Sequence, residues 1–321
     1  MIASLWGRRT IWGSSIWLPI LFAACTGTAG IPQWFDAISR LPVRTILVDG
    51  HRIAYLDVGE GSPVILIHGF GGSLWQWEYQ QDALSRRHRL ITLDLVGSGF
   101  SDKPDIGYTP DELVSFFRHF MDALHVSRAS LVGNSMGAGL AIGMALAHPE
   151  RVDHLALISG LPNRVQDKLT SPLIKRGLDR WAPDWLINVG SYFTGQRVTR
   201  RVLSEIIHDK ALITPAVLER SHRNRKRPGM LKPVLKTADN LPLWEAGFAQ
   251  RLGEIRQPVL IVWGAEDRVF PPDVGEDMHR QISGSRLELI PNAGHIPMWE
   301  RPDVVNPLLI DFLQLDTEKT P

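Results

Sequence analysis

A serine lies between two closely spaced glycines in the first half of the chain. The stretch LVGNSMGAGL, residues 131–140, contains the pattern Gly133-x-Ser135-x-Gly137. An apolar run precedes the pattern and a run rich in alanine and glycine follows it, which predicts a strand-to-helix turn with the serine at its apex. Such a turn strains the backbone at its apex and needs small residues on either side. It would expose the serine hydroxyl as a nucleophile, next to the free N–H groups that begin a helix.

The elements that must position this serine alternate between strands and helices. Runs such as PVILIH and LITLDL are continuously apolar, as is typical of strands buried on both faces. Asp49-Gly50 separates the first two β-rich runs and predicts an opening hairpin. The predicted strands span residues 44–48, 51–58, 63–68, 90–95, 129–132, 152–158, 258–263 and 286–290, and the predicted helices span 74–84, 110–124, 136–147, 274–282 and 303–315. This order predicts an α/β fold whose mostly parallel sheet is covered by helices on both faces.

The alternation stops between residues 161 and 252. This segment is helix-like, rich in arginine and lysine, and interrupted by prolines. We interpret it as a helical cap, inserted into a core that spans residues 43–160 and 253–316. Its basic run at residues 223–227 is typical of a solvated face, and the alternative is a membrane-surface or anionic-substrate role.

The first thirty residues, 1–30, are expected to be a targeting segment. Arg8-Arg9 precedes an apolar stretch of about 14 residues, which is short for a hydrocarbon core ~30 Å thick. A basic start, a short apolar middle and small residues after it are typical of a secretory signal. Cys25 ends the stretch LFAAC, which resembles the lipobox of bacterial lipoproteins, where the cysteine is acylated. We therefore predict export to a bacterial cell envelope, as a periplasmic protein or a membrane-anchored lipoprotein. The alternatives are a plain signal peptide cleaved near Thr28-Ala29 and an uncleaved N-terminal anchor.

The bulk composition narrows the class of protein. The 321 residues carry a net charge of +1, and charged residues make up 21% of the chain, as in an ordinary globular protein. This balance predicts no nucleic-acid partner. Cys25 is the one cysteine, so a chain that loses or acylates it has no thiol for catalysis or zinc binding. His208, His222 and His279 show no metal-ligand spacing, and we expect neither a metal nor a cofactor.

Three stretches together resemble the α/β-hydrolase family. HGFGG at residues 68–72, DLVGSGFSDKP at residues 94–104 and GNSMG at residues 133–137 follow successive predicted strands in the order typical of that family. The resemblance covers nearly the whole chain from about Val43. It implies the α/β-hydrolase fold, with the segment between the core halves as its cap.

The same resemblance assigns roles to particular residues. It implies Ser135 as nucleophile, His295 as base in the loop after the last strand, and Asp267 as the acid that orients the base, with Glu266 as the fallback. The backbone N–H groups of Phe70 and Met136 would hold the oxyanion. We expect His68 to be a structural hydrogen bonder and Asp94 a loop cap. Five further histidines at element ends or on polar helix faces are expected to be solvated: His88, His119, His125, His148 and His154.

The resemblance leaves several reactions open. A serine at residue 135 disfavours the relatives that use aspartate there, which are epoxide and haloalkane hydrolases. Our main prediction is a carboxylic ester hydrolase, an esterase or lipase that acts on a small-molecule ester with an apolar acyl group through an acyl-enzyme. The sequence around GNSMG also resembles meta-cleavage-product hydrolases, so hydrolysis of a carbon–carbon bond in a vinylogous diketone is the alternative. A non-catalytic binding protein on the same fold is a further alternative.

Overall fold

Eight strands form one sheet in the part of the chain that the computed structural model describes, residues 43–178, 183, 187 and 194–314. The strands are β1 (Arg44–Val48), β2 (His51–Val58), β3 (Pro63–Ile67), β4 (Arg89–Leu93), β5 (Ala129–Asn134), β6 (Val152–Ile158), β7 (Val259–Gly264) and β8 (Arg286–Ile290). Their spatial order is β1-β2-β4-β3-β5-β6-β7-β8. β2 is antiparallel to β1 and to β4, and the other neighbouring pairs are parallel. The predicted α/β fold is therefore confirmed. The predicted targeting segment at residues 1–30, with Cys25, lies outside the described residues.

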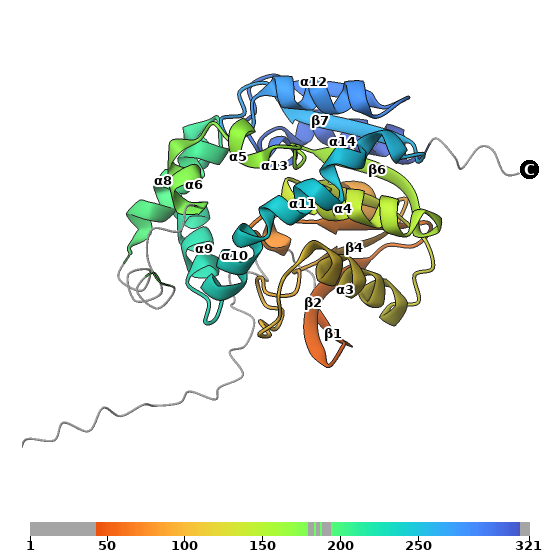
Figure 1. Ribbon diagram of the computed structural model, residues 1–321, viewed down its shortest axis with the longest axis horizontal. Coiled ribbons are helices and arrows are strands. Elements are labelled where there is room, and N and C mark those ends of the chain that lie inside the picture. The colour runs from red at the N-terminus through yellow and green to blue at the C-terminus, as the bar shows by residue number, and fades with distance from the viewer. Residues whose placement is uncertain (1–42, 179–182, 184–186, 188–193, 315–321) are drawn as a thin grey trace, which may run out of the picture. The chain divides into compact units, whose positions relative to one another are not determined.

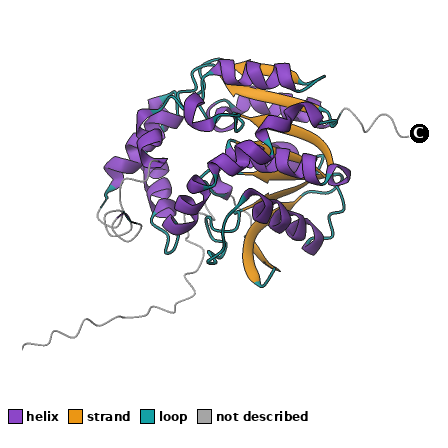
Figure 2. Cartoon of the chain, viewed as in Figure 1, coloured by secondary structure: helices purple, strands orange, loops and turns teal. Residues whose placement is uncertain are grey.

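The apolar strands divide their side chains between two cores. Successive side chains of a strand point to opposite faces, and in β3 Ile65 and Ile67 join one hydrophobic cluster while Val64 and Leu66 join the other. The first cluster lies under α3 (Pro110–Ala123), α4 (Met136–Ala147) and α12 (Pro272–Gln281), and the second under α14 (Pro302–Leu313) and the shorter α13 (Pro297–Glu300). Helices therefore cover both faces, as Figure 2 shows.

The prediction of one continuous helix at residues 74–84 is wrong. The structure has a 3-10 turn, η1 (Leu74–Trp77), and a short helix, α2 (Gln81–Ser85), in its place. The Leu74 amide donates to the Asp94 carboxylate at 2.7 Å. The Gln76 side chain accepts from the Gly69 amide at 3.0 Å. Tertiary contacts to two other loops thus determine the conformation of this segment, against its helical periodicity.

The described residues between β6 and β7 are helical. They form α5 (Val165–Lys168), α6 (Pro172–Leu178), α8 (Gln196–Ile206), η3 (Lys210–Leu212), α9 (Pro215–Arg225), α10 (Leu231–Asp239), α11 (Leu241–Gly247) and η4 (Ala249–Glu254). Figure 1 shows α5, α6, α8, α9 and α10 gathered beside one end of the sheet. α11 packs on the core instead, because Trp244 lies against Gly139 of α4. The exact division into core and cap stays a prediction.

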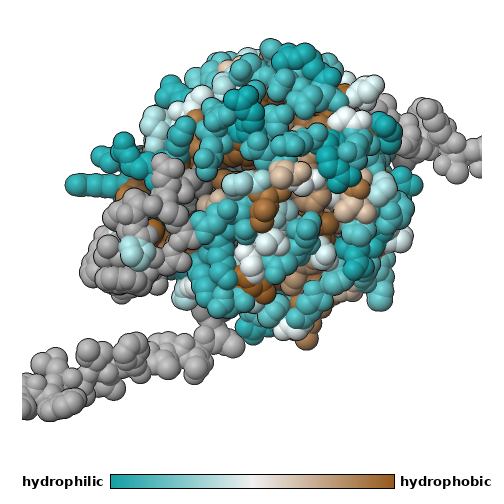
Figure 3. All heavy atoms as spheres, in the orientation of Figure 1, coloured by the Kyte–Doolittle hydropathy of each residue, from teal (hydrophilic) through white to brown (hydrophobic). Residues whose placement is uncertain are grey.

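The surface carries mostly polar side chains. Figure 3 shows a face that is largely hydrophilic, with apolar patches of limited extent. Among the described helices, we find none with the length and apolarity needed to cross a membrane.

Candidate active site

Ser135 lies at the turn between β5 and α4. Its backbone has φ 54° and ψ −116°, which is strained for a residue with a side chain. The Ser135 amide donates to the carbonyl of Ile158 at 2.9 Å, so the neighbouring strand stabilises the turn. A Cβ on Gly133 would lie 2.3 Å from the Gly137 oxygen, and one on Gly137 would lie 2.2 Å from the oxygen of Ile67. Only glycine fits at these two positions.

Asp267 and His295 are brought together at the ends of β7 and β8. The Nδ1 atom of His295 is 2.8 Å from Oδ2 of Asp267, and both side chains are buried. The other carboxylate oxygen of Asp267 accepts from the amides of Val269 and Phe270 at 2.7 and 3.1 Å. These bonds orient the carboxylate toward the imidazole, as an acid that orients a base requires.

Glu266, the fallback acid, makes a different contact. Its carboxylate accepts from the Ala293 amide at 3.0 Å. Its own amide donates to the Ala293 carbonyl, also at 3.0 Å. Glu266 therefore ties two loops together, and of the two adjacent carboxylates Asp267 is the one bonded to the imidazole.

The loop that carries His295 is tied to the residue before the nucleophile. The Asn134 side-chain amide donates to the carbonyls of Ile158 and His295 at 3.2 and 3.1 Å. Within the described residues, no hydrogen bond joins the Ser135 hydroxyl to the His295 imidazole. Such bonds are often long without substrate. The catalytic roles of these three residues stay a prediction.

Phe70 and Met136 line one small pocket, together with residues that include Leu95, Tyr108 and Pro233. Its enclosed space is about 20 Å³, which is room for little more than a water molecule. Neither amide donates a hydrogen bond to another described residue, and the Met136 amide is the first of α4. Both are therefore free to bind an oxyanion. Ser135 and His295 are not among the residues that line this pocket.

Helix α9 of the cap contacts the loop that carries Phe70. The Asn224 side chain donates to the carbonyl of Gly71 at 3.3 Å. Arg220 makes two hydrogen bonds to the Glu78 carboxylate, at 3.0 and 2.9 Å, and lies over the ring of Trp75. This contact between α9, in the segment predicted to be the cap, and the loop after β3 is buried and polar.

The solvated face expected for the basic run at residues 223–227 is therefore wrong in part. Asn224 is buried, and the Arg227 guanidinium lies 3.6 Å from the centre of the Phe100 ring. Arg220 and Asn224 are spaced i, i+4 on one face of α9, and this spacing was the available signal, while Arg227 lies just after the helix.

His68 and Asp94 have structural roles, as expected. Nε2 of the buried His68 accepts from the Leu95 amide at 3.1 Å, so Nδ1 carries the proton that is donated to the carbonyl of Gly69. Burial lowers the pKa of His68, which keeps its ring neutral. Asp94 accepts from the Leu74 amide at the start of η1 and from the Phe100 amide in the loop after β4.

The solvated positions expected for His88 and His154 are wrong. Both side chains are buried. His88 lies 2.9 Å from the Ser62 hydroxyl, and His154 lies in β6 with its ring edge against Phe312. Strand β6 is central and has helices on both faces, so even a polar residue on it is covered.

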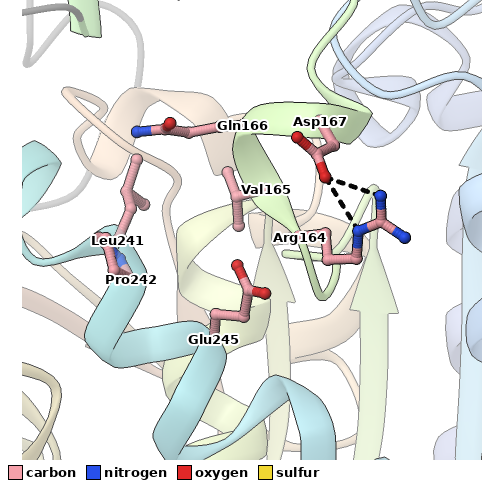
Figure 4. A pocket seen from close by; sticks show the side chains of 7 residues that line it. All are labelled: Arg164, Val165, Gln166, Asp167, Leu241, Pro242 and Glu245. Atoms are coloured by element: carbon pink, nitrogen blue, oxygen red, sulfur yellow. Dashed lines mark hydrogen bonds and ion pairs between the residues drawn. The ribbon is translucent and has the colours of Figure 1, made fainter.

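A second hollow lies between α5 and α11. Figure 4 shows Arg164 and Asp167 turned toward each other at its edge, with 2.8 Å between their charged groups. Val165, Leu241 and Glu245 also line it. None of the candidate catalytic residues borders this hollow. Within the described residues, no group of three or more histidine, cysteine or carboxylate side chains is placed to hold a metal ion.

Comparison with known proteins identifies the family. The model of the α/β hydrolase fold family matches residues 62–302. This chain belongs to the α/β-hydrolase family.

Several similar proteins are named as hydrolases of 2-hydroxy-6-oxo compounds or of meta-cleavage products. The 2-hydroxy-6-oxononadienedioate/2-hydroxy-6-oxononatrienedioate hydrolase of Comamonas testosteroni is 32% identical over 274 residues, which are 82% of this chain and 91% of that protein. A 2-hydroxy-6-oxo-6-phenylhexa-2,4-dienoate hydrolase of the same species is 32% identical and covers 89% of this chain and 98% of its own length. A solved meta-cleavage product hydrolase from Pseudomonas fluorescens superposes with a TM-score of 0.74 at 29% identity, covering 85% of this chain and 98% of its own.

These relatives overturn the main functional prediction from the sequence. The prediction of a hydrolase is confirmed by the family. The prediction of an ester hydrolase is wrong, because relatives at about 30% identity are named for 2-hydroxy-6-oxo-dienoate or meta-cleavage product substrates. The physical reason for the error is that the same nucleophile, base and oxyanion donors serve both reactions. The residues around Ser135 therefore do not distinguish an ester from an activated ketone.

Proposed function

We propose that this chain hydrolyses a carbon–carbon bond in a vinylogous diketone of the 2-hydroxy-6-oxo-dienoate class. The observation that carries the proposal is the set of relatives named for such substrates, at about 30% identity over more than four fifths of the chain. The arrangement of Ser135, the Asp267–His295 pair and the two free amides is compatible with it.

The chemistry sets a requirement that ester hydrolysis lacks. A carbon leaving group departs only when its electron pair is delocalised. The 2-hydroxy-dienoate therefore first gains a proton at C5 and loses one from its 2-hydroxyl, which gives a 2-oxo group conjugated through C3=C4. Cleavage of the C5–C6 bond then sends the electron pair to the oxygen on C2.

Each proposed residue has a place in this sequence. His295 takes the Ser135 proton as the serine oxygen bonds to C6, and the amides of Phe70 and Met136 bind the resulting alkoxide. Collapse breaks the C5–C6 bond, and His295 returns its proton to the oxygen on C2. Water, activated by His295, then releases the acyl group from Ser135 as a carboxylic acid. Asp267 orients the imidazole throughout.

The decisive test compares two substrate classes on the same enzyme preparation. Synthetic 2-hydroxy-6-oxo-6-phenylhexa-2,4-dienoate absorbs visible light that is lost on cleavage, and benzoate is the acid product. A chain-length series of nitrophenyl esters is measured beside it, with Ser135→Ala as the blank. We expect dienoate turnover with kcat/KM well above that for every ester. Efficient ester hydrolysis with no dienoate turnover would overturn the proposal.

We further propose export, on the basis of the N-terminal segment. Its support is the basic start, the short apolar stretch and the small residues around Cys25. Radiolabelled palmitate supplied to expressing bacteria should enter the full chain and be absent from Cys25→Ala. Incorporation that survives this substitution would refute acylation at Cys25, and an uncut chain in the cytosol would refute export.

A further inference from the structure

Glu300 is a buried carboxylate that bridges two parts of the chain. It ends α13, five residues after His295. Its Oε1 accepts from the Gly294 amide at 2.8 Å, in the loop that carries His295. Its Oε2 accepts from the amides of His208 and Asp209 at 2.6 and 3.2 Å, just after α8 of the cap. Both carboxylate oxygens thus accept backbone hydrogen bonds.

The two segments that Glu300 bridges also touch through their backbones. The His295 amide donates to the carbonyl of Ile206 at 2.8 Å. A Cβ on Gly294 would lie 2.7 Å from that same oxygen and 3.0 Å from the amide nitrogen of His208. The close approach therefore requires a glycine, and the Glu300 carboxylate fills the polar space beside it. The backbone of the candidate base is bonded directly to the cap at this point.

We propose that Glu300 is a positioning residue that keeps His295 in place by tying its loop to the end of α8. Three N–H groups point at one carboxylate, and an ionised carboxylate accepts from all of them. A proton on either oxygen would remove the negative charge and weaken these bonds, which loosens the tie between the two segments. Glu300 acts through His295 and does not touch substrate. The inference rests on the proposed Ser135–His295 chemistry, and not on the choice between carbon–carbon bonds and esters.

The charge of Glu300 is sensitive to pH in the neutral range. Burial raises the pKa of Glu300 to about 7, against the opposing effects of the three backbone hydrogen bonds and of Lys210. The Lys210 ammonium donates to the carbonyls of Ser204 and Ile207, and burial, followed by the charge of Arg268, lowers the pKa of this lysine. His208 and Asp209 contact Glu300 through their backbone amides.

The test follows the labelling of Ser135 by a fluorophosphonate as a function of pH. This reagent reports the nucleophile and its base for any natural substrate. In the wild type, protonation of Glu300 should loosen the loop of His295, so the labelling rate should fall as the pH drops below about 7. Glu300→Gln should make this fall shallower, because it removes the titrating carboxyl group. It should also lower the rate at pH 8 roughly tenfold, because one charge-assisted hydrogen bond is lost.

Glu266→Gln is the matched control. Glu266 is a carboxylate of the same loop pair, but it accepts from Ala293 rather than from the cap. We expect this variant to keep the wild-type pH dependence. A Glu300→Gln variant that labels at the wild-type rate across the pH range would overturn the positioning role. Glu300→Asp keeps the charge but shortens the side chain, and a wild-type labelling rate in this variant would overturn the role even if Glu300→Gln does not fold.

The result separates this inference from the proposed function. If the fluorophosphonate labels Ser135 with the expected pH dependence but the dienoate is not turned over, the role of Glu300 stands and the substrate proposal is removed. A wild-type protein that the fluorophosphonate does not label at all would remove both.

Discussion

The two halves of the candidate site are held by different physical means. Ser135 is held by close packing of the backbone, since a Cβ on Gly133 or Gly137 would collide with neighbouring backbone oxygens. His295 is held by polar contacts, namely Asp267 on its ring and Glu300 on its loop. Close packing does not depend on pH, whereas hydrogen bonds to carboxylates do. The nucleophile should therefore keep its geometry under conditions in which the base loses its position.

The largest expected effects are losses of activity when the nucleophile or the partner of the base is replaced. Ser135→Ala should lower kcat by roughly 10⁶-fold, and Asp267→Asn by about 10⁴-fold, because the nucleophile is lost in one and only the orientation of the base in the other. Dienoate turnover measures both. Equal losses in the two variants would show that the Asp267–His295 contact is as indispensable as the nucleophile.

A steric substitution should affect folding rather than chemistry. Gly137→Ala places a Cβ 2.2 Å from the Ile67 oxygen, and should lower the free energy of unfolding by about 4 kcal/mol or more. Gly247→Ala is the control, because a Cβ there has no neighbour within 4 Å and alanine favours a helix. Urea unfolding measures both. A Gly137→Ala variant of normal stability would show that the turn adapts and is not held by close packing.

The polar attachment of α9 should be sensitive to the loss of one charge. Glu78→Gln leaves the guanidinium of Arg220, which is 6% exposed, without its carboxylate. We expect a loss of about 3 kcal/mol in stability, because a buried charge without its partner is strongly unfavourable. Glu254→Gln breaks the exposed pair with Arg251 and should leave the urea midpoint unchanged. Equal midpoints for both variants would argue against a buried attachment.

The last expected effect is a dependence of stability on pH. The pKa of Glu300 rises from 4.5 to about 7 on folding, so between these values the folded protein binds more protons than the unfolded chain. Its contribution to stability is complete below pH 4.5 and is lost as the pH rises to 7. Glu300→Gln should remove this decline from a series of urea unfolding curves. If wild type and variant lose stability in parallel over that range, burial of Glu300 is not its cause.

The sequence predicted most of the fold because the relevant signals are local. The apolar runs of the central strands, the Asp49-Gly50 hairpin and the capped start of α3 lie within a few residues of the elements they determine. The helix predicted at residues 74–84 was wrong because Asp94 and Gly69, from other loops, bind its first turn. The substrate class was also predicted wrongly, since neither the turn nor the triad pattern depends on the leaving group.

By itself, the sequence determined the turn at Ser135, because two glycines and a change from strand to helix pattern suffice to define it. Only the tertiary structure decided that Asp267 rather than Glu266 faces His295, that α9 turns Asn224 toward the Gly71 carbonyl, and that Glu300 bridges the cap and the base loop. These contacts join residues far apart in the chain. Their geometry depends on how the sheet and the cap pack, which no short stretch of sequence encodes.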